Sequence, residues 1–196
     1  MPDLTQLLER GYLIVPAFLD AGLVQELQLA IDLRDSRGEF RAAAVGAGVA
    51  RTVRPSVRGD RIQWLDRPQG PAESQMLERL ETLRLALNEQ GGLGVFDLEC
   101  HYAMYPPGAR YARHLDRSAA GAERIVSVVL YLNPQWQDSD GGKLRLYSNP
   151  VVEVAPCGGT LVLFLSESLE HEVLETRAER RSLTGWYRRR ARQLNG

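Results

Sequence analysis

The chain has 196 residues, of which 44% are hydrophobic and 25% are charged, and its formal net charge is −1. This length favours a single domain with a sizeable core over two full domains. A net charge so close to zero gives no overall field that would recruit nucleic acid or an anionic membrane. Residues 1–10 lack the basic start and apolar run of a signal peptide, and no membrane-spanning stretch is visible, so we expect a cytoplasmic protein.

Two amphipathic helices are predicted in the N-terminal half of the chain. Asp20 caps the first, whose apolar residues recur at helical spacing to about Arg34. The second carries its apolar stripe over about 76–87 and ends at the glycine pair 91–92. Between them, the Ala- and Gly-rich segment 41–57 predicts a mobile loop or an irregular hairpin, and 58–65 is typical of a strand.

From residue 96 onward the hydrophobic period changes to two. Glycine and proline turns separate short apolar runs at 96–104, 125–132, 143–147, 151–154, 160–165 and 183–188. Helices followed by many short strands predict an α+β, mainly β fold, and a double-stranded β-helix (jelly roll) supported by N-terminal helices fits best. We expect one domain over 1–196, with helical support to about 94 and the jelly-roll core over about 95–190.

The cysteine content is low and shows no metal-binding or disulfide spacing. Cys100 and Cys157 are the two cysteines of the chain. We expect both to be small buried hydrophobic residues in a reducing compartment.

A candidate metal site is visible at His114, Asp116 and His171. Side chains two residues apart on an extended strand point to the same face, so one imidazole and one carboxylate can share a metal. A distant histidine can complete the set, and two histidines with one carboxylate are the ligands of non-heme Fe(II) oxygenases. The His-x-Asp pattern alone is weak, since a strand histidine bonded to a nearby acid has the same sequence. Zn(II) with these ligands is also chemically possible.

Arg180 follows His171 by nine residues, at the start of the last predicted strand. A 2-oxo acid that chelates iron needs its far carboxylate held, and the planar, permanently charged guanidinium does this with two hydrogen bonds. Strand alternation places Arg180 on the same face as Ser182, Thr184 and Trp186, and Arg181 on the other face. The alternative is that Arg180 belongs to an ordinary solvated arginine cluster.

With these residues identified, the chain resembles the Fe(II)- and 2-oxoglutarate-dependent dioxygenases. More narrowly, it resembles the prolyl hydroxylases of hypoxia-inducible factor and their bacterial homologues. The matching stretches are Arg-Gly-Asp-Arg-Ile-Gln-Trp (58–64), Tyr-Pro (105–106), Tyr-Ala-Arg-His-Leu-Asp (111–116), the run from 124 to Tyr-Leu-Asn (131–133), Gly-Gly-Lys-Leu-Arg (141–145) and His-Glu-Val (171–173), then Arg180 and Trp186. Their order and spacing over most of 58–188 are more specific than any one motif.

The resemblance implies a role for each matching residue. The residues that would bind Fe(II) are His114, Asp116 and His171. The residues that would form the 2-oxoglutarate site are Arg180, which grips the distal carboxylate, Tyr131 as a second donor, Val129, Tyr105 and Trp186. The residues that would surround the substrate entrance are Asp60, Trp64, Tyr111 and Arg124, with 41–58 acting as a lid.

The resemblance also implies the reaction. O2 would drive oxidative decarboxylation of 2-oxoglutarate to succinate and CO2, coupled to hydroxylation of a proline in a protein loop, with ascorbate as the reductant. Elongation factor Tu is the target class of the bacterial relatives. Two departures bear on the pocket: the approach from Tyr105 to Tyr111 is one residue shorter than in the animal enzymes, and Gly185 stands where a branched residue is expected.

Other functions stay open on the sequence alone. The same iron chemistry could act on nucleic acid, as in the AlkB group, but that normally needs a basic groove, which a net charge of −1 does not favour. A small-molecule substrate is harder to exclude. A non-catalytic, cupin-like metal-binding module would require a structural Arg180. The Arg-Gly-Asp tripeptide at 58–60 is not taken as an integrin motif, and the arginines at 188–192 are taken as a solvated terminal run rather than a nucleic-acid contact.

Overall fold

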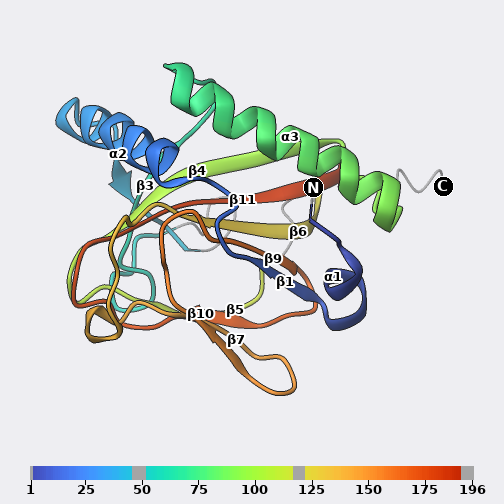
Figure 1. Ribbon diagram of the computed structural model, residues 1–196. Coiled ribbons are helices and arrows are strands. Elements are labelled where there is room, and N and C mark those ends of the chain that lie inside the picture. The colour runs from blue at the N-terminus through green and yellow to red at the C-terminus, as the bar shows by residue number, and fades with distance from the viewer. Residues whose placement is uncertain (1, 46–51, 117–121, 191–196) are drawn as a thin grey trace.

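The computed structural model describes residues 2–45, 52–116 and 122–190, and its elements form three layers (Figure 1). Helices α2 (Ala21–Ser36) and α3 (Pro71–Gly91) cover one face of a large antiparallel sheet, and a smaller antiparallel sheet faces its other side. A short helix, α1 (Thr5–Arg10), precedes the first strand. Two facing antiparallel sheets with a helical cover confirm the predicted jelly roll of mainly β class. No helix within the described ranges has the length and hydrophobicity needed to cross a membrane.

The larger sheet has seven strands in the order β1-β9-β6-β11-β4-β3-β2, and the smaller has four in the order β5-β10-β7-β8. The strands of the larger sheet are β1 (Tyr12–Val15), β2 (Arg41–Ala42), β3 (Arg61–Trp64), β4 (Asp97–Tyr105), β6 (Ala122–Tyr131), β9 (Leu161–Leu165) and β11 (Arg180–Arg190). The strands of the smaller sheet are β5 (Tyr111–His114), β7 (Leu144–Leu146), β8 (Val152–Val154) and β10 (His171–Val173). A 3-10 turn, Asp138–Asp140, precedes β7.

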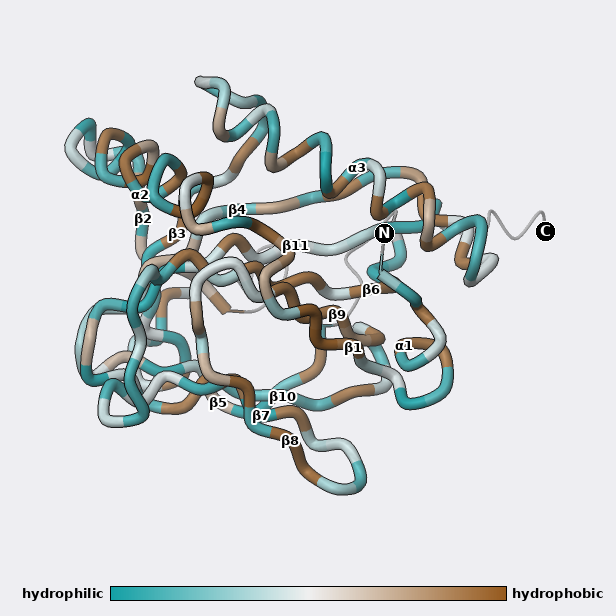
Figure 2. The backbone as a smooth tube through the Cα atoms, viewed as in Figure 1, coloured by the Kyte–Doolittle hydropathy of each residue, from teal (hydrophilic) through white to brown (hydrophobic). Residues whose placement is uncertain are grey.

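Strand alternation divides the hydrophobic core into two layers. In β4, Cys100, Tyr102 and Met104 pack towards the helices, whereas Ala103 and Tyr105 pack between the two sheets. Figure 2 shows hydrophobic residues concentrated along the neighbouring strands β1, β9 and β6, while α3 alternates between hydrophobic and hydrophilic residues along its length. The second layer, between the sheets, is the one that surrounds the candidate site.

The predicted helices and their ends are confirmed. Asp20 caps α2, and its Oδ1 accepts a hydrogen bond of 2.9 Å from the Leu23 N–H. Helix α3 ends at Gly92, whose φ of 59° lies in the left-handed region that favours glycine. The first 94 residues contribute more than helical support, however, because β1, β2 and β3 join the larger sheet. Strand β1, which pairs with β9, forms from the apolar run at Tyr12.

The segment predicted as a loop or irregular hairpin is a hairpin where the structure describes it. Strand β2 pairs with β3, and Val45 and Thr52 exchange two backbone hydrogen bonds of 2.8 and 2.9 Å. Residues 46–51, in the middle of the expected lid, lie outside the described residues.

The two cysteines differ in their environment. Cys100 is buried beneath the helices, as predicted, but Cys157 is exposed, so that half of the prediction is wrong. Cys157 lies in the turn before β9, where the chain leaves the smaller sheet for the larger one. Both thiols are free.

The arginines at the end of β11 have acidic partners. Arg188 forms ion pairs of 2.6 and 3.2 Å with Asp97 and Glu99, and Arg189 pairs with Glu123. These ion pairs cross between neighbouring strands and neutralise much of the local positive charge. The expectation of a solvated terminal run changes in part, because Arg188 and Arg189 belong to β11 and form these ion pairs; Arg192 lies outside the described residues.

Gly185 lies where β11 approaches β4 most closely. A Cβ atom at this position would be 2.5 Å from the Glu99 carbonyl oxygen and 2.6 Å from the Cβ of Cys100. The position faces the helices with Leu183 and Tyr187, on the opposite side of the strand from Trp186. The expected effect on the pocket therefore does not come from direct contact, and the departure at Gly185 is instead a requirement of strand packing.

A buried ion pair joins α2 to α3. Arg34 donates hydrogen bonds of 2.8 and 2.9 Å from Nε and Nη2 to the Glu73 carboxylate, which also accepts from the Tyr102 hydroxyl and the Gln69 N–H. Burial alone would raise the pKa of Glu73, but these hydrogen bonds outweigh it and lower the pKa. The carboxylate is therefore ionised and fully satisfied beneath the helices.

Removing this charge should destabilise the fold. We expect Glu73→Gln to lower the free energy of unfolding by about 3 kcal/mol at pH 7, because it leaves the buried Arg34 without its bidentate partner. Glu81→Gln, which affects an exposed i,i+3 pair with Arg84 on the same helix, should change it by less than about 0.5 kcal/mol. Urea unfolding measures both, and equal effects of the two substitutions would contradict the prediction. Since the pKa of Glu73 is lowered on folding, the wild-type advantage should shrink as the pH falls below about 4.

Candidate metal centre and its cavity

The two candidate histidines lie directly opposite each other on neighbouring strands. His114 ends β5 and His171 begins β10, and the antiparallel register pairs these two residues. Their ring centroids are 4.2 Å apart, and both rings point between the sheets. Two residues that are 57 positions apart in the chain are thus brought together by one strand pairing.

Asp116 completes a three-residue cluster with them. Its Oδ1 lies 3.6 Å from Nε2 of His114, and its Oδ2 lies 3.5 Å from Nε2 of His171. The three potential ligand atoms all lie within 4.8 Å of one another. The donor set of two imidazoles and one carboxylate fits a divalent transition metal such as Fe(II).

Hydrogen bonds to the backbone fix which imidazole nitrogen is available. Nδ1 of His114 is 2.8 Å from the Ala112 carbonyl oxygen, and Nδ1 of His171 is 3.2 Å from that of Leu169. A carbonyl oxygen only accepts, so each Nδ1 carries the proton and each Nε2 presents its lone pair to the cluster. Burial lowers the pKa of His171 to about 4, so this imidazole is neutral at pH 7.

The carboxylate is ionised despite its burial. Desolvation alone would raise the pKa of Asp116, but the two imidazoles and a hydrogen bond from Ser127 outweigh it and hold the pKa well below its usual range. Asp116 is 8% exposed and Ser127 is fully buried. The cluster therefore presents one carboxylate charge and two imidazole nitrogens, which suits a dication.

A cavity of about 530 Å³ extends from this cluster between the two sheets. Its apolar wall is formed by residues from both sheets: Val129, Leu144, Phe164 and Val173. Aromatic and polar residues form the rest, among them Trp64, His101, Tyr105, Tyr111, Arg124, Arg180 and Trp186. The cavity thus combines apolar walls with convergent polar and charged groups, the two features that a site for a small polar molecule needs.

Arg180 projects into this cavity from the start of β11 and is 1% exposed. Its Nε donates a hydrogen bond of 2.9 Å to the Gly142 carbonyl oxygen, and the rings of Tyr105 and Tyr131 flank the guanidinium at 5.0 and 5.1 Å. Within the described part of the chain, no carboxylate forms an ion pair with it. A buried guanidinium without a countercharge is costly, so a carboxylate guest is its natural partner.

The ring of Tyr131 lies beside the Arg180 guanidinium, although Tyr131 is not among the residues that line the cavity. Its hydroxyl is buried and has no hydrogen-bond partner among the residues that the structure describes. Burial raises the pKa of Tyr131 to about 12, so the hydroxyl keeps its proton and can donate. Unsatisfied buried donors are rare in proteins and indicate a missing partner.

The residues expected at the entrance take different positions. Trp64 and Arg124 line the cavity, and the Arg124 guanidinium lies 3.4 Å from the ring centroid of Trp186. Tyr111 stacks on the ring of His114 at 3.7 Å. Asp60 does not line the cavity; it is buried and binds Arg58, which does.

His101, which lines the cavity, and Ser127, which binds Asp116 without lining it, were not foreseen from the sequence. His101 is buried with its ring 4.8 Å from that of Trp64 and 5.6 Å from that of Trp186. The period-two pattern of 96–104 already places His101 on the strand face that points away from the helices, so its orientation could have been predicted. Ser127 bonds Asp116, and its only signal is a hydroxyl within a run of valines.

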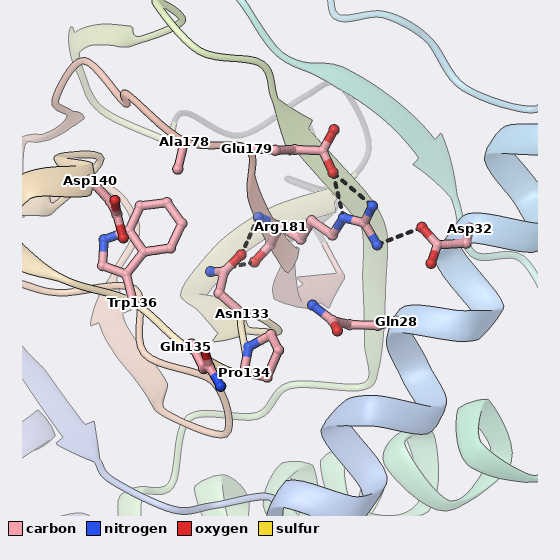
Figure 3. A pocket seen from close by; sticks show the side chains of 10 residues that line it. All are labelled: Gln28, Asp32, Asn133, Pro134, Gln135, Trp136, Asp140, Ala178, Glu179 and Arg181. Atoms are coloured by element: carbon pink, nitrogen blue, oxygen red, sulfur yellow. Dashed lines mark hydrogen bonds and ion pairs between the residues drawn. The ribbon is translucent and has the colours of Figure 1, made fainter.

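A second, polar pocket of about 340 Å³ lies between α2 and the turns that follow β6 and precede β11 (Figure 3). Arg181 reaches into it and forms ion pairs of 2.7 Å with Asp32 and with Glu179. The Arg181 N–H also donates to the Asn133 side chain. Arg180 and Arg181 therefore face opposite sides of β11, as strand alternation predicts.

Comparison with known proteins supports these observations. A sequence model of the 2OG-Fe(II) oxygenase superfamily (2OG, 2-oxoglutarate) matches residues 100–188. The crystal structure of a Pseudomonas putida prolyl-4-hydroxylase is 46% identical with a TM-score of 0.86, and the match covers 95% of this chain and 97% of that chain. A Trichoplax adhaerens prolyl hydroxylase, in complex with a peptide of the hypoxia inducible factor oxygen degradation domain, is 33% identical with a TM-score of 0.81, covering 94% and 86%.

A more distant structure shares the fold alone. A 2OG-Fe(II) oxygenase family oxidoreductase from Burkholderia pseudomallei is 22% identical with a TM-score of 0.63, and the match covers 95% of this chain and 92% of that chain. The extent and identity of the two nearer matches, together with the His-Asp-His cluster in the cavity, show that the chain belongs to the 2OG-Fe(II) oxygenase superfamily.

Proposed function

We propose that this protein is an Fe(II)- and 2-oxoglutarate-dependent protein prolyl hydroxylase. It couples oxidative decarboxylation of 2-oxoglutarate to succinate and CO2 with hydroxylation of a proline in a protein loop. The observation that carries the proposal is the buried Arg180, which has no carboxylate partner in the described residues and shares one cavity with the His-Asp-His cluster. An inert metal-binding module would have no need for an unneutralised buried cation.

Each end of the cavity has a separate task in this proposal. His114, Asp116 and His171 hold Fe(II), which together with 2-oxoglutarate supplies the O2-activating chemistry when bound. Arg180 binds the distal carboxylate of 2-oxoglutarate through its free N–H groups. Tyr131 donates a further hydrogen bond to that carboxylate from a hydroxyl that has no partner among the described residues.

The remaining cavity residues orient these groups and exclude water. The carbonyl oxygens of Ala112 and Leu169 fix the imidazole tautomers, and Tyr111 holds the ring plane of His114 by stacking. Val129 and Phe164 form apolar walls that keep water from the reacting atoms. Ascorbate would serve as the reductant that maintains Fe(II).

A peptidyl proline suits the open end of the cavity. Trp64 and Trp186 present flat apolar surfaces on which a pyrrolidine ring can pack, and Arg124 above Trp186 can donate to a peptide carbonyl. The similar Trichoplax enzyme is in complex with a peptide, which supports a protein substrate here. We propose that the protein acts in the cytoplasm, where elongation factor Tu is the first substrate to test.

Binding of a 2-oxoglutarate analogue should depend on Arg180. With Mn(II) present, N-oxalylglycine at about 100 times its dissociation constant should raise the melting temperature of the wild type by roughly 5–10 °C. Arg180→Ala should abolish this shift, because it removes the cation that binds the distal carboxylate. Tyr131→Phe should weaken binding by about tenfold, the equivalent of one hydrogen bond.

Arg181→Ala is the matched control for that measurement. It removes a neighbouring arginine whose ion pairs lie on the other side of the strand, and the shift with N-oxalylglycine should persist. A wild type that shows no shift would favour a non-catalytic metal-binding module.

Hydroxylation should be detectable by mass spectrometry. A bacterial extract incubated with the protein, Fe(II), ascorbate and 2-oxoglutarate should contain one protein site at which a proline gains one oxygen, and His114→Ala should leave that site unmodified. Modification of elongation factor Tu would name the target. Steady succinate release without protein oxidation, lost in His114→Ala, would instead indicate a small-molecule or nucleic-acid substrate.

A further inference from the structure

Two buried serines form a hydrogen-bonded chain that ends on the Asp116 carboxylate. The Ser127 hydroxyl in β6 donates a hydrogen bond of 2.7 Å to Oδ2 of Asp116. The Ser166 hydroxyl, which directly follows β9, lies 2.9 Å from that of Ser127. Both serines are fully buried. Two hydroxyls have therefore been taken out of water beside a candidate metal ligand.

The direction of this chain is fixed by proton counting. A hydroxyl has one proton, and an ionised carboxylate only accepts. Because Ser127 commits its proton to Asp116, the proton between the two serines must come from Ser166. Ser166 is itself held against β6, since its backbone N–H donates to the Ile125 carbonyl oxygen at 3.1 Å. The chain thus runs from Ser166 through Ser127 to Asp116.

Core packing alone does not account for a serine at position 127. The residue lies in a run of isoleucine and valine, where it is the only hydroxyl between Ile125 and Val129. Its side chain faces the space between the sheets, as do those of Val129 and Tyr131. Burying a hydroxyl there is unfavourable unless it is hydrogen-bonded, and its bond to the charged Asp116 is of the strong, charge-assisted kind.

The position of Asp116 explains why a hydrogen bond from Ser127 matters. His114 and His171 belong to the smaller sheet, where strand pairing holds them, whereas Asp116 lies beyond the end of β5. Ser127 and Ser166 belong to β6 and to the residue that follows β9, in the larger sheet. The Ser127 hydrogen bond therefore attaches the third ligand, Asp116, to the opposite sheet.

We propose that Ser166 and Ser127 form a relay that positions the Asp116 carboxylate for metal binding, with Ser127 as the positioning residue. The inference rests on the proposed metal centre, because it takes Asp116 as a ligand. By holding Oδ2, Ser127 limits rotation of the carboxylate, so that less freedom is lost when the metal binds. Partners of this type typically contribute a factor of about 10–100 to metal affinity.

Mn(II) affinity is the direct test of the relay. The EPR signal of free Mn(II) gives the dissociation constant in the absence of any reaction, so the readout is independent of activity. We expect Ser127→Ala to weaken Mn(II) binding by about 10–100-fold. Ser127→Thr, which keeps the hydroxyl, should bind more tightly than Ser127→Ala. The melting temperature of each metal-free variant reports whether the fold is retained.

Two further serine variants make the result specific. Ser166→Ala leaves Ser127 in place but removes the donor that orients it, and should weaken Mn(II) binding by a smaller factor. This variant also carries the test if Ser127→Ala does not fold. Ser182→Ala removes an equally buried hydroxyl from the larger sheet that contacts Arg180, and should leave Mn(II) affinity unchanged.

The failure of the relay and that of the metal centre give different results. If wild type binds Mn(II), His114→Ala does not, and Ser127→Ala binds within twofold of wild type, the relay is overturned while the metal centre stands. If Ser182→Ala weakens binding as much as Ser127→Ala, the effect is one of packing and the relay is again overturned. A wild type that binds no Mn(II) overturns the metal centre and the relay together.

Discussion

The pairing of His171 with His114 across β10 and β5 is the constraint on which the whole site depends. Side chains alternate along a strand, so a slip of one residue would turn His171 outward and bring Glu170 or Glu172 into the cavity. The register is held from both sides, since β10 also pairs with β7. On the outer face, Arg145 forms an ion pair with Glu172, its partner in the register of β7 and β10, and Arg113 forms an ion pair diagonally with Glu170, next to His171.

The cavity divides its tasks between the two sheets. The smaller sheet supplies the two imidazoles, and the larger sheet supplies Arg180, with Tyr105 and Tyr131 beside it. A ligand that touches both the metal and the guanidinium must therefore bridge the sandwich. Helices α2 and α3 do not contact this space; they support the larger sheet from behind, so that its strands can present polar residues on the inner face without losing their core.

The features that could be predicted from the sequence are those that depend on neighbouring residues in the chain. Asp20 as a cap, Gly92 as a stop and the alternation in β4 each depend on neighbours in the chain, and each was predictable. The metal ligands could be suggested by spacing and by family resemblance, but their meeting depends on a strand pairing that no local pattern encodes.

Long-range partners explain what was missed. The strand at Tyr12 forms by pairing with β9, a distant segment of the chain. Cys157 is exposed because it lies in a turn between the two sheets rather than in a strand. Asp60 was expected at the entrance, but it is buried outside the cavity lining and forms an ion pair with Arg58, which does line the cavity. The sequence does not indicate which of the two faces the cavity. Ser127 could not be assigned a role until Asp116 was placed beside it.

The close approach at Gly185 has a consequence for how sequences of this family vary. The carbonyl oxygen of Glu99 and the Cβ of Cys100 occupy the space that any side chain at 185 would need. A relative with a branched residue there must hold β4 and β11 further apart, because backbone atoms cannot be trimmed as a side chain can. The neighbouring residues His101 and Trp186, on the other face of these strands, would then separate as well. The residue at 185 should therefore report the spacing of β4 and β11, and with it the width of a pocket that it never touches.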